Sequence, residues 1–66
     1  MIEPKQKPTV KLIGLDSNAF AVLGRVQDAL RKAGADDEYI AQYQREATSG
    51  DYSNLLLITM EYVNVN

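Results

Sequence analysis

Two short polar segments hold the side chains that could do chemistry. Asp16 and Asn18 lie in the first segment, and Glu46 and Asp51 lie in the second. Carboxylate and amide oxygens are the ligands that calcium and magnesium accept in proteins. The sequence does not contain the regular calcium-loop spacing, D-x-[DN]-x-[DN]-G. A metal site at these four residues is therefore one alternative interpretation, and it requires the two segments to meet in space.

Helix termini explain the same residues without a ligand. Asp16, Ser17 and Asn18 are all suited to cap a helix, because their side-chain oxygens accept from the free N–H groups of the first turn. Those N–H groups also suit a small anion, although the carboxylate of Asp16 opposes one. In the second segment, Gly50 is predicted to end one helix in a left-handed conformation, and either Asp51 or Ser53 is predicted to cap the next.

The absence of two residue types argues against catalysis. The 66-residue chain contains no His and no Cys. It therefore lacks the commonest zinc ligand, the usual general base near neutral pH and any disulfide. A chain of this length also leaves little room for a substrate pocket. We expect a protein that is not an enzyme and needs no cofactor.

The charge and hydropathy of the chain restrict its partners. A formal net charge of -2 argues against nucleic acid as the main partner. Lys5, Lys7 and Lys11 with Arg25 keep a nucleic-acid accessory role as a second alternative. No apolar run approaches the ~20 residues that span a bilayer, so we expect no membrane partner. The first eight residues do not resemble a signal peptide, and the lack of Cys fits a cytoplasmic protein.

The longest amphipathic pattern, residues 16–34, predicts a helix that forms the main wall of the core. Gly34 is placed to take the left-handed conformation that ends many helices. Asp28 and Lys32 form an i,i+4 ion pair in the favourable order. Gly24 costs about 1 kcal/mol relative to alanine inside a helix. Its place in the pattern predicts a notch that admits another backbone, another chain or a ligand.

The remaining segments predict a fold of mixed class. Residues 9–15 and 62–65 favour strands, and residues 36–49 favour a second helix. We predict a third helix over residues 52–61, although the run LLLI and the β-branched Ile58 and Thr59 also allow a strand there. Because a lone strand leaves its backbone groups unpaired, the two strands should pair with each other. The prediction is an α+β, mostly α domain over residues 9–66, with the order β-α-α-α-β, a small two-stranded sheet joining the termini, and a flexible arm over residues 1–8.

The helical and strand periodicities together predict a core. Its members should be the apolar residues that fall on the inner faces: Val10, Leu12, Phe20, Leu23, Val26, Leu30, Ile40, Tyr43, Leu56, Met60 and Val63.

The residues left outside this core predict a contact surface. Leu57 and Ile58 are apolar but do not belong to the core face, and Phe20 stands at the edge of its own helix face. Gly24 and Arg25 follow one turn later. Small domains often gain stability by associating. We therefore expect a small protein-interaction module that binds a protein partner or a second copy of itself.

Three segments together resemble a family of small bacterial and phage-associated proteins with no established function. They are VKLIG at residues 10–14, D-x-NAF with GRV at residues 16–26, and EATSGDY at residues 46–52. The family usually has Gly where Ser17 stands and Asp-His where Ser53 and Asn54 stand. The resemblance spans roughly residues 9–65. It implies a small α-rich α+β domain in a mobile-element context, and it implies no reaction.

Overall fold

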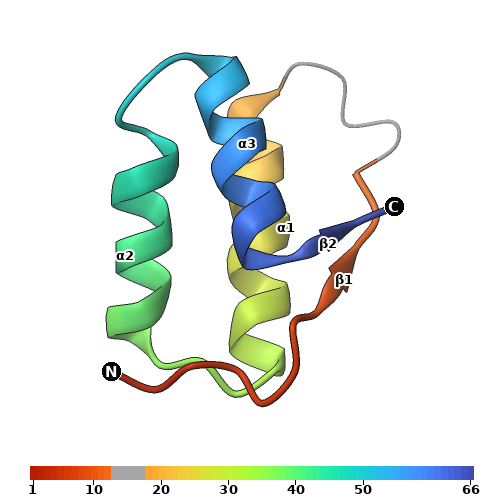
Figure 1. Cartoon of the computed structure of the whole chain (residues 1–66), viewed down its shortest axis with the longest axis vertical. Helices are drawn as coiled ribbons and strands as arrows, with labels where there is room; N and C mark the ends of the chain where they lie inside the picture. Colours follow the sequence, from red (N-terminus) through yellow and green to blue (C-terminus); the bar gives the residue numbers. More distant parts are fainter. Residues whose placement is uncertain (13–17) are drawn as a thin grey trace.

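A computed structural model describes residues 1–12 and 18–66. It contains β1 (Thr9–Val10), α1 (Ala19–Lys32), α2 (Asp37–Ala47), α3 (Tyr52–Tyr62) and β2 (Asn64–Val65). The predicted mostly α order β-α-α-α-β is confirmed (Figure 1). The two strands pair in parallel, with Thr9 opposite Asn64 and Val10 opposite Val65.

Both strands are shorter than predicted. α3 continues through Tyr62, so β2 begins only at Asn64. In the described part of the predicted strand 9–15, only Thr9 and Val10 belong to the sheet, and residues 13–15 lie outside the described residues. The short sheet joins Thr9–Val10 to the C-terminal strand beside α1, whereas the N-terminus itself lies near the start of α2 (Figure 1).

Both ends of α1 follow from local sequence signals. The side chain of Asn18 caps the helix by accepting from the N–H of Ala21 at 3.1 Å. The other predicted caps, Asp16 and Ser17, lie outside the described residues. At the far end Gly34 has a φ of 103°, and the N–H of Ala35 reaches back to the carbonyl oxygen of Leu30 at 3.0 Å. This left-handed ending confirms the prediction for Gly34.

The second helix begins as predicted but ends differently. Asp36 caps it by accepting from the N–H of Tyr39 at 2.9 Å, and this hydrogen bond lowers the pKa of the Asp36 carboxyl. The predicted left-handed Gly50 is wrong, because Gly34 alone has a positive φ among the described glycines. Side chains satisfy the terminal carbonyl oxygens instead, since the hydroxyls of Thr48 and Ser49 donate to them at 2.7 and 2.8 Å.

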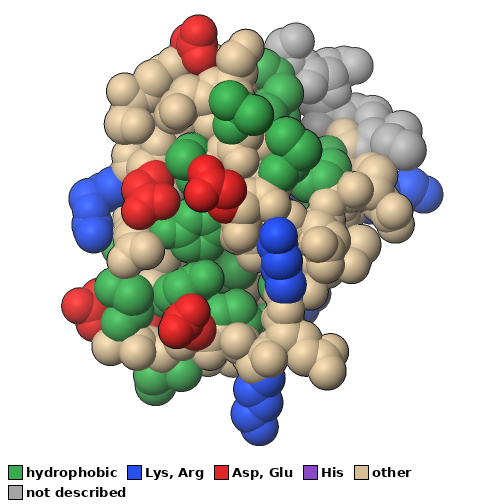
Figure 2. All heavy atoms as spheres, viewed as in Figure 1, with side chains coloured by type: hydrophobic (Ala, Val, Ile, Leu, Met, Phe, Trp, Pro, Cys, Tyr) green, Lys and Arg blue, Asp and Glu red, His purple; other side chains and the backbone are tan. Residues whose placement is uncertain are grey.

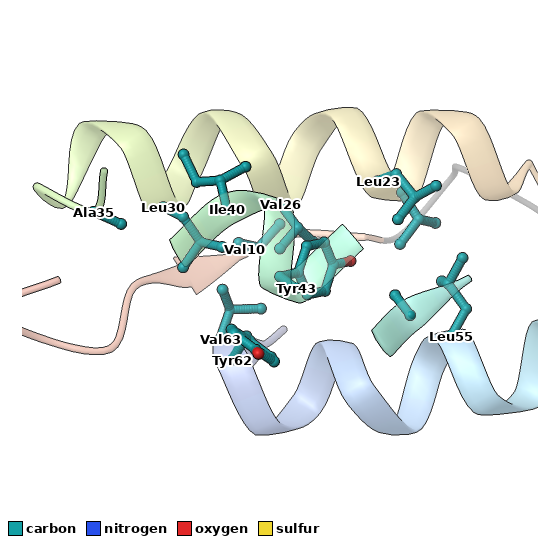
Figure 3. Packing of buried hydrophobic residues seen from close by; sticks show 12 residues of the cluster. Val10, Leu23, Val26, Leu30, Ala35, Ile40, Tyr43, Leu55, Tyr62 and Val63 are labelled. Carbon is teal, nitrogen blue, oxygen red and sulfur yellow. The ribbon is translucent and has the colours of Figure 1, made fainter. Parts of the chain in front are cut away.

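The core lies where the three helices and the sheet meet (Figure 3). Two predicted members are wrong, because Phe20 is 86% exposed and Met60 is 50% exposed. Leu12 and Leu56 are only partly buried against the core. The other seven predicted members are buried: Val10, Leu23, Val26, Leu30, Ile40, Tyr43 and Val63.

The errors in α3 have one cause. The helix buries Leu55, Thr59 and Tyr62, whereas the prediction placed the next residue, Leu56 or Met60, on the inner face. A shift of one residue rotates the buried face by about 100°. Burial of Thr59 is possible because its hydroxyl shares a 2.8 Å hydrogen bond with that of Tyr43.

The first eight residues run along one end of the helices (Figure 1). The N–H of Lys5 donates to the carbonyl oxygen of Ala33 at 3.3 Å, and the N–H of Asp36 donates to that of Ile2 at 3.1 Å. These hydrogen bonds hold the arm against the link between α1 and α2. The flexibility predicted for the arm stays a prediction.

Among the described residues, no helix combines the length and the apolar character that crossing a membrane requires.

Candidate protein-interaction site

A hollow of about 230 Å³ lies where the start of α1 meets the turn between α2 and α3. We call it the Phe20 hollow, and its lining residues are Ala19, Phe20, Leu23, Ala47, Thr48, Gly50, Asp51, Tyr52 and Leu55. The sequence left open whether the two polar segments meet in space. The hollow shows that the start of α1 and residues 47–52 lie side by side.

The lining of the Phe20 hollow is mainly apolar. Leu23, Ala47 and Leu55 are buried, and Figure 3 shows Leu23 of α1 directed toward Leu55 of α3. Phe20 borders the same hollow but is the most exposed of the large apolar side chains in the described chain. An aromatic ring left in water beside an apolar hollow forgoes the stabilisation that burial would give it.

The described residues of the predicted metal site make hydrogen bonds within the chain. Asn18 caps α1, and Asp51 caps α3 by accepting from the N–H of Asn54 at 2.9 Å. Glu46 accepts the hydroxyl proton of Tyr62 at 3.0 Å. Asp16 lies outside the described residues. Within those residues, no group of three or more Asp, Glu, His or Cys side chains is placed to hold a metal ion.

Sequence reasoning missed a tyrosine cluster between α2 and α3. The ring of Tyr62 packs edge-on against Tyr43 and Tyr39, with centroids 5.1 and 5.4 Å apart. Its hydroxyl donates to Glu46 and accepts from the Gln42 amide at 2.9 Å. Burial, assisted by the Glu46 carboxylate, raises the pKa of Tyr62 to about 12. The i,i+4 spacing of Tyr39 and Tyr43 was the available signal, but only the folded chain adds Tyr62.

The other predicted contact residues do not line the Phe20 hollow. Gly24 is exposed, and a Cβ atom built on it would meet nothing within 4 Å. Arg25 donates to the carbonyl oxygen of Lys11 at 3.3 Å. Leu57 is 60% exposed on α3, whereas Ile58 packs partly against the core. The structure thus brings only Phe20, of these five, to the hollow.

Comparison of the chain with protein-family models, with curated proteins and with solved structures found no match. The resemblance to small bacterial and phage-associated proteins therefore stays a prediction.

Proposed function

We propose that this chain is a small non-enzymatic protein-interaction module, and that a second copy of the chain is its partner at the Phe20 hollow. The observation that carries this proposal is the exposed ring of Phe20 at the edge of an apolar hollow. Burying a phenylalanine side chain stabilises by about 1.5–3 kcal/mol.

The case for a second copy rests on self-complementarity. The apolar side chain and the hollow that suits it lie on one surface of the molecule. In a two-fold dimer the same patch is used on both subunits, so the Phe20 ring of each copy enters the hollow of the other. Association also supplies burial that a chain of 66 residues cannot reach alone.

The genomic context and cellular location of such a module are proposed from the sequence. The resemblance to phage-associated proteins supports a mobile-element context, and the lack of Cys supports the cytoplasm. Both are part of the proposal.

Sedimentation equilibrium tests the proposal with one variant and one control. The wild-type chain should form dimers, and Phe20→Ala should shift the equilibrium toward monomer by a factor of about 100 or more, because two rings lose their burial. Met60→Ala is the matched control, since Met60 is another exposed large apolar residue but lies outside the hollow. It should leave the dimer intact.

Two results would count against the proposal. A wild-type chain that stays monomeric at millimolar concentration would exclude a second copy as the partner. A Phe20→Ala variant that dimerises like the wild type would place the contact elsewhere on the chain.

A further inference from the structure

Charge is divided unevenly between the two halves of the chain. Residues 1–35 hold six basic and three acidic residues, and residues 36–66 hold one basic and six acidic residues. In Figure 2 most acidic side chains lie over α2 and α3, and most visible basic side chains lie near the arm and β1. Although the net charge of the chain is -2, its N-terminal half therefore forms a basic surface.

That basic surface is concave. One hollow of about 490 Å³ lies between the arm and the end of α1, and a second of about 170 Å³ lies between β1 and α1. Thr9 lines both hollows, so they form one continuous surface that we call the basic trough. Its described basic residues are Lys5, Lys7, Lys11, Arg25 and Lys32.

One acidic residue, Asp28, also lines the trough. Its carboxylate lies 3.1 Å from the ammonium group of Lys32. This pair largely cancels its own charge. The remaining four basic side chains, which are all exposed, leave the trough with an excess of positive charge.

The backbone of β1 offers hydrogen-bonding groups to the same trough. The N–H groups of Asn64 and Asn66 donate to the carbonyl oxygens of Pro8 and Val10, at 2.8 and 3.0 Å. Thr9 lies between these two acceptors, so in a parallel pair its own N–H and C=O point away from β2. An extended peptide that adds to a strand edge uses such groups.

We propose that the basic trough binds an extended acidic segment of another polypeptide. Carboxylates of that segment pair with Lys5, Lys7, Lys11 and Arg25, and its main chain pairs with Thr9. The trough is separate from the Phe20 hollow, so this second contact goes beyond the proposed function.

A polypeptide fits this surface better than nucleic acid does. Single-stranded nucleic acid gains much of its affinity by stacking bases on aromatic side chains, and none of the described residues that line the trough is aromatic. A second copy does not fit either, because most of the chain's acidic residues belong to helices or their caps.

The test is a titration of the isotope-labelled full chain with a synthetic dodecapeptide of alternating Glu and Thr, at about 100 mM salt, where charges more than ~10 Å apart are screened. The amide resonances of Thr9 and Val10 should move, and those of Ala47 and Leu55 in the Phe20 hollow should not. Lys7→Glu and Lys11→Glu should each weaken binding at least about threefold.

Arg45→Glu is the matched control. It changes the net charge equally, but Arg45 is exposed on α2 and does not line the trough. It should leave peptide affinity within about twofold. Circular dichroism would verify that each variant is folded, and the wild-type titration needs no variant.

Three outcomes would overturn the proposal. The first is no movement of the Thr9 amide at millimolar peptide. The second is an equal loss of affinity in Arg45→Glu, which would indicate unspecific attraction. The third is tighter binding of a thymidine dodecanucleotide, which would assign the trough to nucleic acid. None of these affects the Phe20→Ala test, because the two surfaces share no lining residue.

Discussion

The α2–α3 interface and the end of the molecule around the Phe20 hollow use similar residues with opposite results. At the interface Tyr43 is fully buried, and its hydroxyl meets that of Thr59. At the hollow Phe20 is almost fully exposed. The difference teaches that the position of an aromatic residue along its helix, and not its residue type, decides whether it is buried. Phe20 lies in the first turn of α1 and borders a hollow lined by the end of α2, the start of α3 and the turn between them.

The buried polar side chains of the α2–α3 interface are also all hydrogen-bonded. Within the described part of the chain, every buried side-chain nitrogen or oxygen has a partner. Tyr62 illustrates how this is achieved, because its ring packs on two tyrosines while its hydroxyl reaches Gln42 and Glu46. A region whose polar and apolar groups are both satisfied has little left to offer a partner. The Phe20 hollow, in contrast, leaves an aromatic ring in water that a partner could cover.

Replacing each aromatic residue with alanine gives the largest expected contrast. Tyr43→Ala should cost about 3–5 kcal/mol of unfolding free energy, because it opens a cavity in a packed core. A chain of 66 residues has only about 3–10 kcal/mol in total, so this variant should lose about a third of its stability or more. Phe20→Ala should change stability by less than about 0.5 kcal/mol. Urea unfolding followed by circular dichroism measures both.

The unfolding free energies of the two variants can be compared directly only at a protein concentration where the chain is monomeric. Self-association through the Phe20 hollow would stabilise the wild type by mass action. The measurement therefore belongs at low micromolar concentration, where the proposed dimer dissociates. Equal losses for the two variants under that condition would mean that Phe20 supports the fold and that the two regions do not differ.

Local signals predicted most of the fold. The sequence placed Asn18 and Asp51 among its candidate caps and predicted the left-handed Gly34, because each of these features depends on residues three to five positions away. It did not single out Asp36 as the cap of α2. The inner face of α3 was not readable, because the run LLLI offers an apolar residue in every direction. The face that turns inward carries Thr59, whose hydroxyl shares a hydrogen bond with that of Tyr43 on α2.

The candidate site was predictable only in part. The sequence singled out Phe20 as an interaction residue, but it also placed Phe20 in the core, and periodicity cannot separate these alternatives for a residue at the edge of a helix face. The hollow itself joins α1 to residues some thirty positions later in the chain. The basic trough joins β1 to α1 in the same way. Such surfaces exist only after the elements pack.

Alkaline pH should weaken the α2–α3 interface in particular. Burial raises the pKa of Tyr62 to about 12 and raises that of Tyr43, whereas a tyrosine in the unfolded chain titrates near 10. The folded chain therefore holds these protons more tightly. The contribution of Tyr62 is complete below about pH 10 and is lost as the pH rises through about 12. For Tyr62 the loss should be at most about 3 kcal/mol.

Thermal unfolding between pH 8 and 12 tests this effect by comparing the wild type with Tyr62→Phe. The variant loses the hydrogen bond to Glu46 and should be less stable at pH 8. It has no hydroxyl to ionise at this position, so its midpoint should fall less steeply above pH 10. Parallel curves for the two chains would show that Tyr62 does not contribute to the alkaline loss of stability.

The smallest expected effect belongs to Gly24, on the open side of α1. Gly24→Ala should stabilise the chain by about 0.5–1 kcal/mol, because alanine favours the helix and its Cβ atom would meet nothing within 4 Å. The urea midpoint should rise with an unchanged slope. Gly34→Ala is the matched control, since the φ of 103° at Gly34 strains any other residue and should reverse the sign. If Gly24→Ala is stabilising and dimerises normally, the notch has no role in binding. If it is stabilising but blocks association, the contact surface extends from the Phe20 hollow one turn further along α1.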